Sequence, residues 1–195
     1  MEHYYTVYGY HGCDASICDK LISHTEKFYP SKNGYDWLGD GVYFWENDPI
    51  RALKWAKQNK KINTPAVIEA EISLQHCLDF SRQCDLELLE TAYLLFETVK
   101  KKLDMLPENR CGFPEDIDLI KRYKDCQVIN FACSFYSKVH STSGDFKTNH
   151  SFEVVRSPFS EGDVVFPGTK ITKKQHIQLC VRDVNCIKSM NKFKL

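Results

Sequence analysis

Two short segments near the start of the chain carry side chains suited to holding a ligand. Tyr10-His11-Gly12 ends one apolar stretch, and Gly41-Val42-Tyr43-Phe44 opens another farther along the chain. An imidazole can hold a hydroxyl group through a directed hydrogen bond, and a neighbouring glycine leaves the backbone open. A phenol ring can stack on a flat ligand. Tyr-His-Gly alone is more typical of a structural histidine at a strand end, so the second segment is what favours a binding site.

Strands and helices must position these residues. Tyr, Thr and Val favour strands, and Asp, Asn and Pro mark the starts of helices. These patterns predict five elements in the first third of the chain: a strand over residues 4–10, a helix capped by Asp14 that runs to Ile22, a strand over residues 42–44, a helix capped by Asn47 or Asp48 with Pro49 in its first turn, and a strand over residues 65–72.

The middle of the chain changes to helical patterns, and the last part returns to strands. Helices are predicted over residues 86–103 and from Glu115 to about Tyr136, followed by a loop over 137–151 and strands over 152–156, 163–166 and 175–182. Such segregation of strands and helices is typical of an α+β fold. A Gly-x-Gly-x-x-Gly segment does not follow the first strand, which disfavours a Rossmann-type dinucleotide site.

Composition indicates one ordinary globular domain. The 195 residues are 43% hydrophobic, and 26 basic and 26 acidic residues give a net charge of zero. We therefore expect a single domain over residues 1–195, with a helical insertion at about 78–136. The balanced charge gives no global signal for nucleic acid, although Lys170, Lys173 and Lys174 form a local basic stretch.

Cysteine usage and the N-terminal segment favour a cytoplasmic location. The nine cysteines include no Cys-x-x-Cys pair, and most lie in apolar segments, which predicts reduced and mostly buried thiols. A zinc site of His176, Cys180 and Cys186 lacks the usual ligand spacing, so no metal is expected. The first residues lack the pattern of a secretory signal, and no segment approaches the ~20 apolar residues of a membrane span, so no membrane partner is expected.

The order of these motifs resembles the ADP-ribosyltransferase fold of the diphtheria-toxin and poly(ADP-ribose) polymerase branch. The resemblance rests on Tyr10-His11-Gly12, on Asp36-Trp37-Leu38-Gly39-Asp40-Gly41-Val42-Tyr43-Phe44-Trp45-Glu46, and on the late strand His176-Ile177-Gln178-Leu179-Cys180-Val181-Arg182. It implies a split antiparallel β-sheet core and NAD as co-substrate, broken at the bond between nicotinamide and ribose. It covers roughly half of the chain, at both ends, and the helical middle has no counterpart in the polymerases.

The resemblance assigns roles to residues of the first two motifs. His11 would hold the ribose, and the backbone of Gly12 would hold the nicotinamide amide. Tyr43 and Trp55 would sandwich the nicotinamide ring, although either aromatic could instead be a core residue. The small hydroxyl residue that the polymerases place just before the second aromatic is missing here, so amide binding would depend more on Gly12.

The third motif departs from the family. Alternation along the late strand puts Gln178 where the family has the catalytic glutamate. An amide binds hydroxyl groups but supplies no charge, and losing such a group costs about 3 kcal/mol of transition-state stabilisation. Either the enzyme tolerates this loss or another carboxylate compensates. Glu161 is the first candidate, unless it is an ordinary turn residue, and Glu153 is the second. Arg156 is expected to bind a phosphate of NAD or to pair with Glu161 or Glu153.

The whole order of segments also resembles a bacterial group of small ADP-ribosyltransferases. That group includes toxins of toxin–antitoxin and phage-defence systems, some of which modify nucleic acid. The resemblance implies a mono-ADP-ribosyltransferase acting on a macromolecule, with RNA or DNA slightly favoured over protein and an antitoxin as a further partner. The alternatives are an NAD glycohydrolase and a catalytically inactive module that binds NAD or ADP-ribose.

Overall fold

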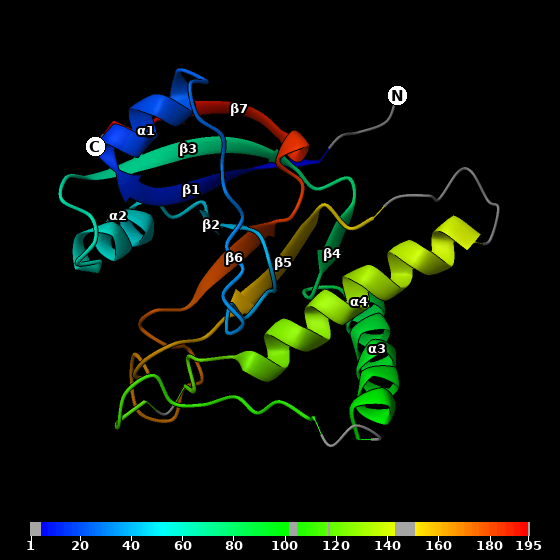
Figure 1. The fold of residues 1–195 in the computed structure, drawn as a ribbon. Coiled ribbons are helices and arrows are strands. Elements are labelled where there is room, and N and C mark those ends of the chain that lie inside the picture. Colours follow the sequence, from blue (N-terminus) through cyan, green and yellow to red (C-terminus); the bar gives the residue numbers. More distant parts are fainter. Residues whose placement is uncertain (1–4, 102–104, 117, 143–150, 195) are drawn as a thin grey trace.

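The computed structural model describes residues 5–101, 105–116, 118–142 and 151–194 (Figure 1). Its strands are Thr6–Asp14 (β1), Val42–Glu46 (β2), Pro65–Ser73 (β3), Cys77–Asp79 (β4), Val154–Phe159 (β5), His176–Val181 (β6) and Ile187–Lys192 (β7). Its helices are Ala15–Ile22 (α1), Pro49–Gln58 (α2), Gln83–Lys101 (α3) and Tyr123–Thr142 (α4), with a 3₁₀ turn at Val184–Cys186.

The strands form one sheet in the order β4-β5-β6-β2-β1-β3-β7. Every neighbouring pair is antiparallel except β4 and β5, which run parallel. Helix α1 lies beside β3 and β7, and α3 and α4 pack on each other near β4 (Figure 1). The predicted α+β class with a mostly antiparallel sheet is therefore confirmed.

The two central strands separate at the end that carries His11. β1 pairs with β3 along its whole length, from Thr6 opposite Ser73 to Asp14 opposite Pro65. Its pairing with β2 is confined to Gly9 opposite Glu46 and Tyr10 opposite Trp45. Beyond Tyr10, β1 and β2 diverge, and the residues that follow on β1 no longer share a ladder with β2.

Helix α2 packs closely on β1 because Gly12 has no side chain. A Cβ atom there would overlap the carbonyl oxygen of Ala52 and lie 3.1 Å from the Cβ of Ala56. The helix begins where the sequence predicted, since the Asp48 side chain accepts a hydrogen bond of 2.8 Å from the Arg51 N–H. The close packing of α2 on Gly12 fixes the position of the residues that α2 presents toward β2.

The core lies on both faces of the sheet. One cluster includes Phe44, Ile72, Leu179 and Val181, and a second joins Cys180 to residues of α4 and of the strands β4 and β5. The predicted alternation along β6 is therefore confirmed. Seven of the nine cysteines are buried, which confirms the prediction of mostly buried cysteines, and none is paired in a disulfide here.

The predicted helix from Glu115 is wrong in its first turns, since α4 begins at Tyr123. The buried carboxylate of Asp116 accepts hydrogen bonds from the backbone N–H groups of Gly112, Asp118 and Ile120, which folds this segment as a turn. Leu119 also has a φ of +49°, which a helix does not allow. At its other end α4 continues to Thr142 into the predicted loop, most of whose remaining residues, 143–150, lie outside the described residues.

The predicted strand over residues 163–166 is also wrong. Those residues form turns between Gly162 and Gly168, both with positive φ, with one isolated bridge from Val164 to Thr172. Val164 and Phe166 are exposed, so a strand there is not stabilised by burial of these side chains. Two strands were not predicted: β4 is only three residues long, and β7 mixes polar and apolar residues at an edge of the sheet.

Candidate functional site

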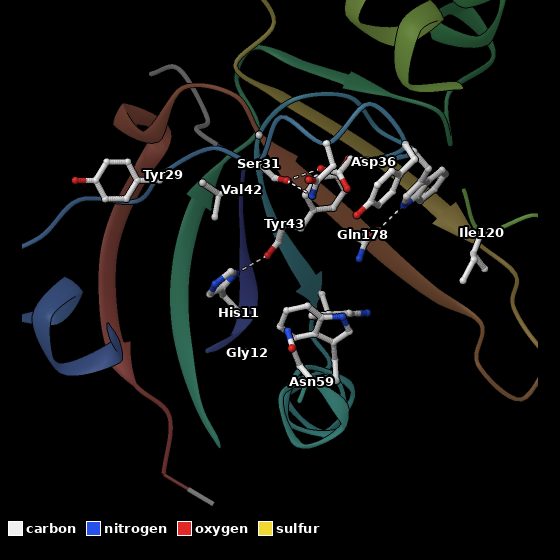
Figure 2. A pocket seen from close by; sticks show the side chains of 16 residues that line it. His11, Gly12, Tyr29, Ser31, Asp36, Val42, Tyr43, Asn59, Ile120 and Gln178 are labelled. Carbon is white, nitrogen blue, oxygen red and sulfur yellow. Dashed lines mark hydrogen bonds between the residues drawn. The ribbon is translucent and has the colours of Figure 1, made fainter. Parts of the chain in front are cut away.

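A cavity of about 560 Å³ lies where β1 and β2 diverge (Figure 2). Five of the residues singled out from the sequence line it, and they come from β1, β2, α2 and β6: His11, Gly12, Tyr43, Trp55 and Gln178. The fold therefore brings together side chains that are up to 167 positions apart in the sequence, as Figure 2 shows for His11 and Gln178. A cavity of this size suits a small-molecule ligand.

The imidazole of His11 is held in one tautomer. Its Nδ1 lies 2.8 Å from the carbonyl oxygen of Tyr43, which can only accept, so Nδ1 carries the proton. Burial lowers the pKa of His11, which favours the neutral ring. Nε2 then keeps its lone pair and can accept a hydrogen bond from a ligand hydroxyl group.

Two aromatic side chains form partly exposed walls of the cavity. The Tyr43 hydroxyl donates to the Gly39 carbonyl at 2.8 Å and accepts from the Leu38 N–H at 3.0 Å, and burial raises its pKa, so the phenol remains neutral and fixed. The side chain of Trp55 is 42% exposed, and its ring centre lies 5.9 Å from that of Trp45. The cavity thus has aromatic surface on both β2 and α2.

Gln178 presents an N–H donor to the cavity. Its Oε1 accepts a hydrogen bond of 2.5 Å from Nε1 of Trp37. An indole N–H can only donate, so the amide oxygen must face Trp37 and the amide nitrogen must face elsewhere. In Figure 2 the side-chain nitrogen of Gln178 points away from the dashed hydrogen bond and into the cavity. The third motif therefore offers a donor at the position where the family has a carboxylate.

Glu161 lies outside the larger cavity and is not a free charge. It lines a neighbouring cavity of about 240 Å³. One carboxylate oxygen lies 2.6 Å from Nη2 of Arg51, and the other lies 3.0 Å from Nζ of Lys174. Both cations neutralise it. The one acidic side chain among the described residues that line the larger cavity is Asp36, which accepts a hydrogen bond of 2.5 Å from the hydroxyl of Ser31.

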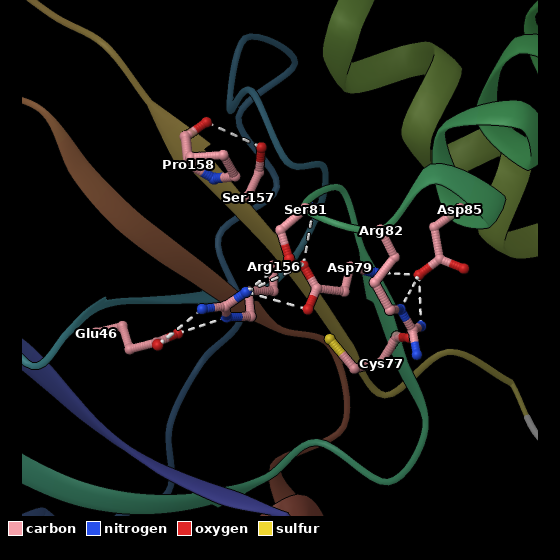
Figure 3. A network of polar contacts seen from close by, with 9 residues as sticks. All are labelled: Glu46, Cys77, Asp79, Ser81, Arg82, Asp85, Arg156, Ser157 and Pro158. Atoms are coloured by element: carbon pink, nitrogen blue, oxygen red, sulfur yellow. Dashed lines mark hydrogen bonds and ion pairs between the residues drawn. The ribbon is translucent and has the colours of Figure 1, made fainter. Parts of the chain in front are cut away.

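The structure does not bring Arg156 to either cavity, nor does it pair it with Glu161 or Glu153. Its guanidinium binds Glu46 through bonds of 2.6 and 2.9 Å and both carboxylate oxygens of Asp79 at 3.1 Å (Figure 3). The hydrogen bonds to Glu46 raise the pKa of the Arg156 guanidinium. Arg156 therefore joins β5 to β2 and β4, and an anionic ligand would have to compete with two carboxylates.

The loop before β2 supplies lining residues that the sequence patterns missed. Ser31 and Gly41 form an isolated bridge that folds the loop over the cavity, and Ser31, Asn33, Tyr35, Asp36 and Trp37 line it. The available signal was the sequence Asp36-Trp37 directly ahead of the Gly41 motif. Trp45 was also missed, although it stands directly opposite Gln178 in the sheet.

Comparisons with known proteins give one relative of unknown role. No protein-family model matches the chain, and no solved structure matches it. The uncharacterized protein MJ0359 of Methanocaldococcus jannaschii is 30% identical over 119 residues, which cover 57% of this chain and 55% of that protein. The chain therefore spans about half the length of this relative, whose name assigns no function.

The described parts of the chain hold neither a membrane-spanning helix nor a cluster of metal ligands. No helix there is both long and apolar enough to cross a bilayer. No group of three His, Cys, Asp or Glu side chains there is arranged to hold a metal ion. Cys180 of the considered zinc set lies instead in the core, where its thiol donates to the Gly39 carbonyl.

Proposed function

We propose that the chain is an NAD-dependent mono-ADP-ribosyltransferase with the ADP-ribosyltransferase fold of the polymerase and diphtheria-toxin branch. The observation that carries the proposal is the cavity between the diverging strands β1 and β2, where His11, Tyr43, Trp55 and Gln178 meet. The donor of ADP-ribose would be NAD, and the acceptor would be a macromolecule.

Each lining group has a task in this reaction. Tyr43 and Trp55 enclose the nicotinamide ring, and the Nε2 atom of His11 accepts a hydrogen bond from a ribose hydroxyl group. The amide nitrogen of Gln178 donates to a ribose oxygen. Gly12 lines the same cavity beside His11, where its backbone is free of β2 and can bind the carboxamide.

The proposed reaction breaks the bond between ribose C1′ and the nicotinamide nitrogen. The bonding electron pair leaves with nicotinamide, which becomes neutral, while positive charge develops on the ribose. A lone pair of the acceptor then forms the new bond at C1′, and the acceptor proton passes to water.

Stabilising the developing positive charge requires a nearby negative group. Gln178 is neutral and Glu161 is paired with Arg51 and Lys174, so we assign this task to Asp36. Its hydrogen bond from Ser31 keeps the carboxylate oriented. The missing glutamate fits transfer of a single ADP-ribose unit rather than synthesis of a polymer.

Incubation of the purified protein with labelled NAD and a cell lysate tests the proposal. We expect release of nicotinamide and a label on protein or nucleic acid, both lost in His11→Ala. Free ADP-ribose without a labelled macromolecule would indicate an NAD glycohydrolase instead. Binding of NAD without nicotinamide release would indicate an inactive binding module, and absence of NAD binding would refute the proposal.

A further inference from the structure

The second cavity of about 240 Å³ adjoins the first. Five residues line both of them: Trp37, Trp45, Trp55, Ile120 and Gln178. A group in the second cavity therefore lies just beyond Gln178, on the side of the loop over residues 160–175. This is where a molecule would stand to react with a ribose held in the first cavity.

The second cavity has an excess of positive charge. Its described lining contains the cations Arg51, Arg122 and Lys174 against the single carboxylate of Glu161. The carboxylate of Glu161 forms ion pairs with Nη2 of Arg51 and Nζ of Lys174. Arg122 uses its two terminal nitrogens on the carbonyl of Asp118 and the carboxylate of Asp125. The three cations thus have two carboxylate partners, Glu161 and Asp125, which leaves an excess of one positive charge.

Three buried N–H donors on the lining residues have no acceptor in the part of the chain that the structure describes. They are Nε1 of Trp45, Nε of Arg51 and Nε of Arg122. Buried donors in proteins are nearly always paired, so three unpaired donors on residues that line one cavity favour an acceptor-rich ligand there. A phosphate group has only acceptor atoms facing a protein and is a preferred partner of arginine.

Most of the rest of the lining is aromatic. The ring centres of Trp37 and Phe159 are 4.5 Å apart, and those of Phe159 and His176 are 5.6 Å apart. The guanidinium of Arg122 lies 5.5 Å from the centre of the Phe159 ring. Aromatic rings interleaved with cations are the usual means by which proteins bind unpaired bases and their phosphates. A carboxylate side chain of a protein acceptor would use the cations but not these rings.

We propose that the second cavity is the acceptor subsite and that its acceptor is a single-stranded nucleic acid. A base stacks on the rings of Trp37 and Phe159, and its phosphate accepts from Arg51, Arg122 and Lys174. This inference rests on the proposed function. A nucleophilic nitrogen or oxygen of the nucleotide forms the bond to C1′ as nicotinamide leaves with the electron pair, and its proton passes to water.

The test measures binding and transfer separately. Single-stranded RNA and DNA homopolymers, the matching duplexes and lysate protein are each offered with labelled NAD to the full chain. Quenching of tryptophan fluorescence by each oligonucleotide, without NAD, gives its affinity. The variants are Arg122→Gln and Lys174→Gln, with Lys170→Gln as the matched control, because Lys170 is exposed in the same loop outside the cavity. Thermal unfolding of each variant shows whether it is folded.

We expect transfer to a single strand but not to a duplex, and tryptophan quenching by the single strand. In Arg122→Gln and Lys174→Gln, the ratio of transfer to nicotinamide release falls on the order of tenfold, as does oligonucleotide affinity, and Lys170→Gln matches the wild type. Label confined to protein, or a ratio and affinity unchanged in folded variants, overturns the inference. Oligonucleotide binding that depends on Arg122 without nicotinamide release refutes the proposed function and leaves the nucleic-acid subsite standing.

Discussion

Replacing Gln178 with glutamate tests whether the neutral amide limits the proposed reaction. The side chain is 9% exposed, and its Oε1 accepts the Trp37 N–H at 2.5 Å. A carboxylate of the same shape keeps that hydrogen bond and places its second oxygen where the amide nitrogen now faces the cavity. The substitution therefore adds one negative charge without removing a contact to the protein.

The expected magnitudes follow from these contacts. A negative group beside the developing positive charge stabilises the transition state by about 3 kcal/mol, so nicotinamide release rises on the order of a hundredfold. Burial of the carboxylate lowers the free energy of unfolding, and the hydrogen bond from Trp37, worth about 1.5–3 kcal/mol to a charged acceptor, offsets part of that loss. We expect a net loss of about 2 kcal/mol or less.

Nicotinamide release from NAD under single-turnover conditions is the assay, and urea unfolding measures the stability. Gln75→Glu is the matched control, because Gln75 is exposed in the turn between β3 and β4 and lines neither cavity. Slower release by Gln178→Glu, with NAD affinity unchanged, would mean that the reaction needs the amide donor and would refute the reasoning about charge.

Three further predictions concern residues that line the two cavities. Gly12→Ala forces a methyl group against the Ala52 carbonyl and lowers the unfolding free energy by about 1–3 kcal/mol in urea titrations, whereas Gly34→Ala, whose Cβ has only ordinary contacts, changes it little. Asp36→Asn slows nicotinamide release on the order of a hundredfold without unfolding the protein; an unchanged rate would mean that another group supplies the charge. Burial lowers the pKa values of His11 and His176 below 6.5. The unfolded chain therefore binds more protons than the folded chain below that pH. The unfolding free energy then falls as the pH drops below about 6.5, by up to about 1.4 kcal/mol per pH unit for each histidine. Unfolding free energies that are equal at pH 7.5 and 5.5 would contradict this.

Local patterns were enough to predict most elements around the larger cavity. Asp14 caps α1 by accepting a hydrogen bond from the Ser16 N–H, and Asp48 caps α2, because capping depends on residues close in sequence. The strand β6 was predicted from its alternating residues, which the two core clusters bury on opposite faces. These predictions needed no knowledge of the tertiary structure.

Pairings between distant residues could not be predicted in this way. Arg156 is 110 positions from its partner Glu46, and Arg51 is 110 positions from Glu161, so the sequence alone did not reveal that both ion pairs are satisfied. The start of α4 depends on the buried carboxylate of Asp116, which no helical pattern encodes. The sequence thus indicated which side chains could do chemistry but not which charges remain unpaired.

A structure determined with bound NAD would show whether the larger cavity holds the dinucleotide. We expect the nicotinamide ring between Tyr43 and Trp55, with a ribose hydroxyl group donating to Nε2 of His11. NAD bound elsewhere, or no bound NAD at saturating concentration, would contradict this expectation.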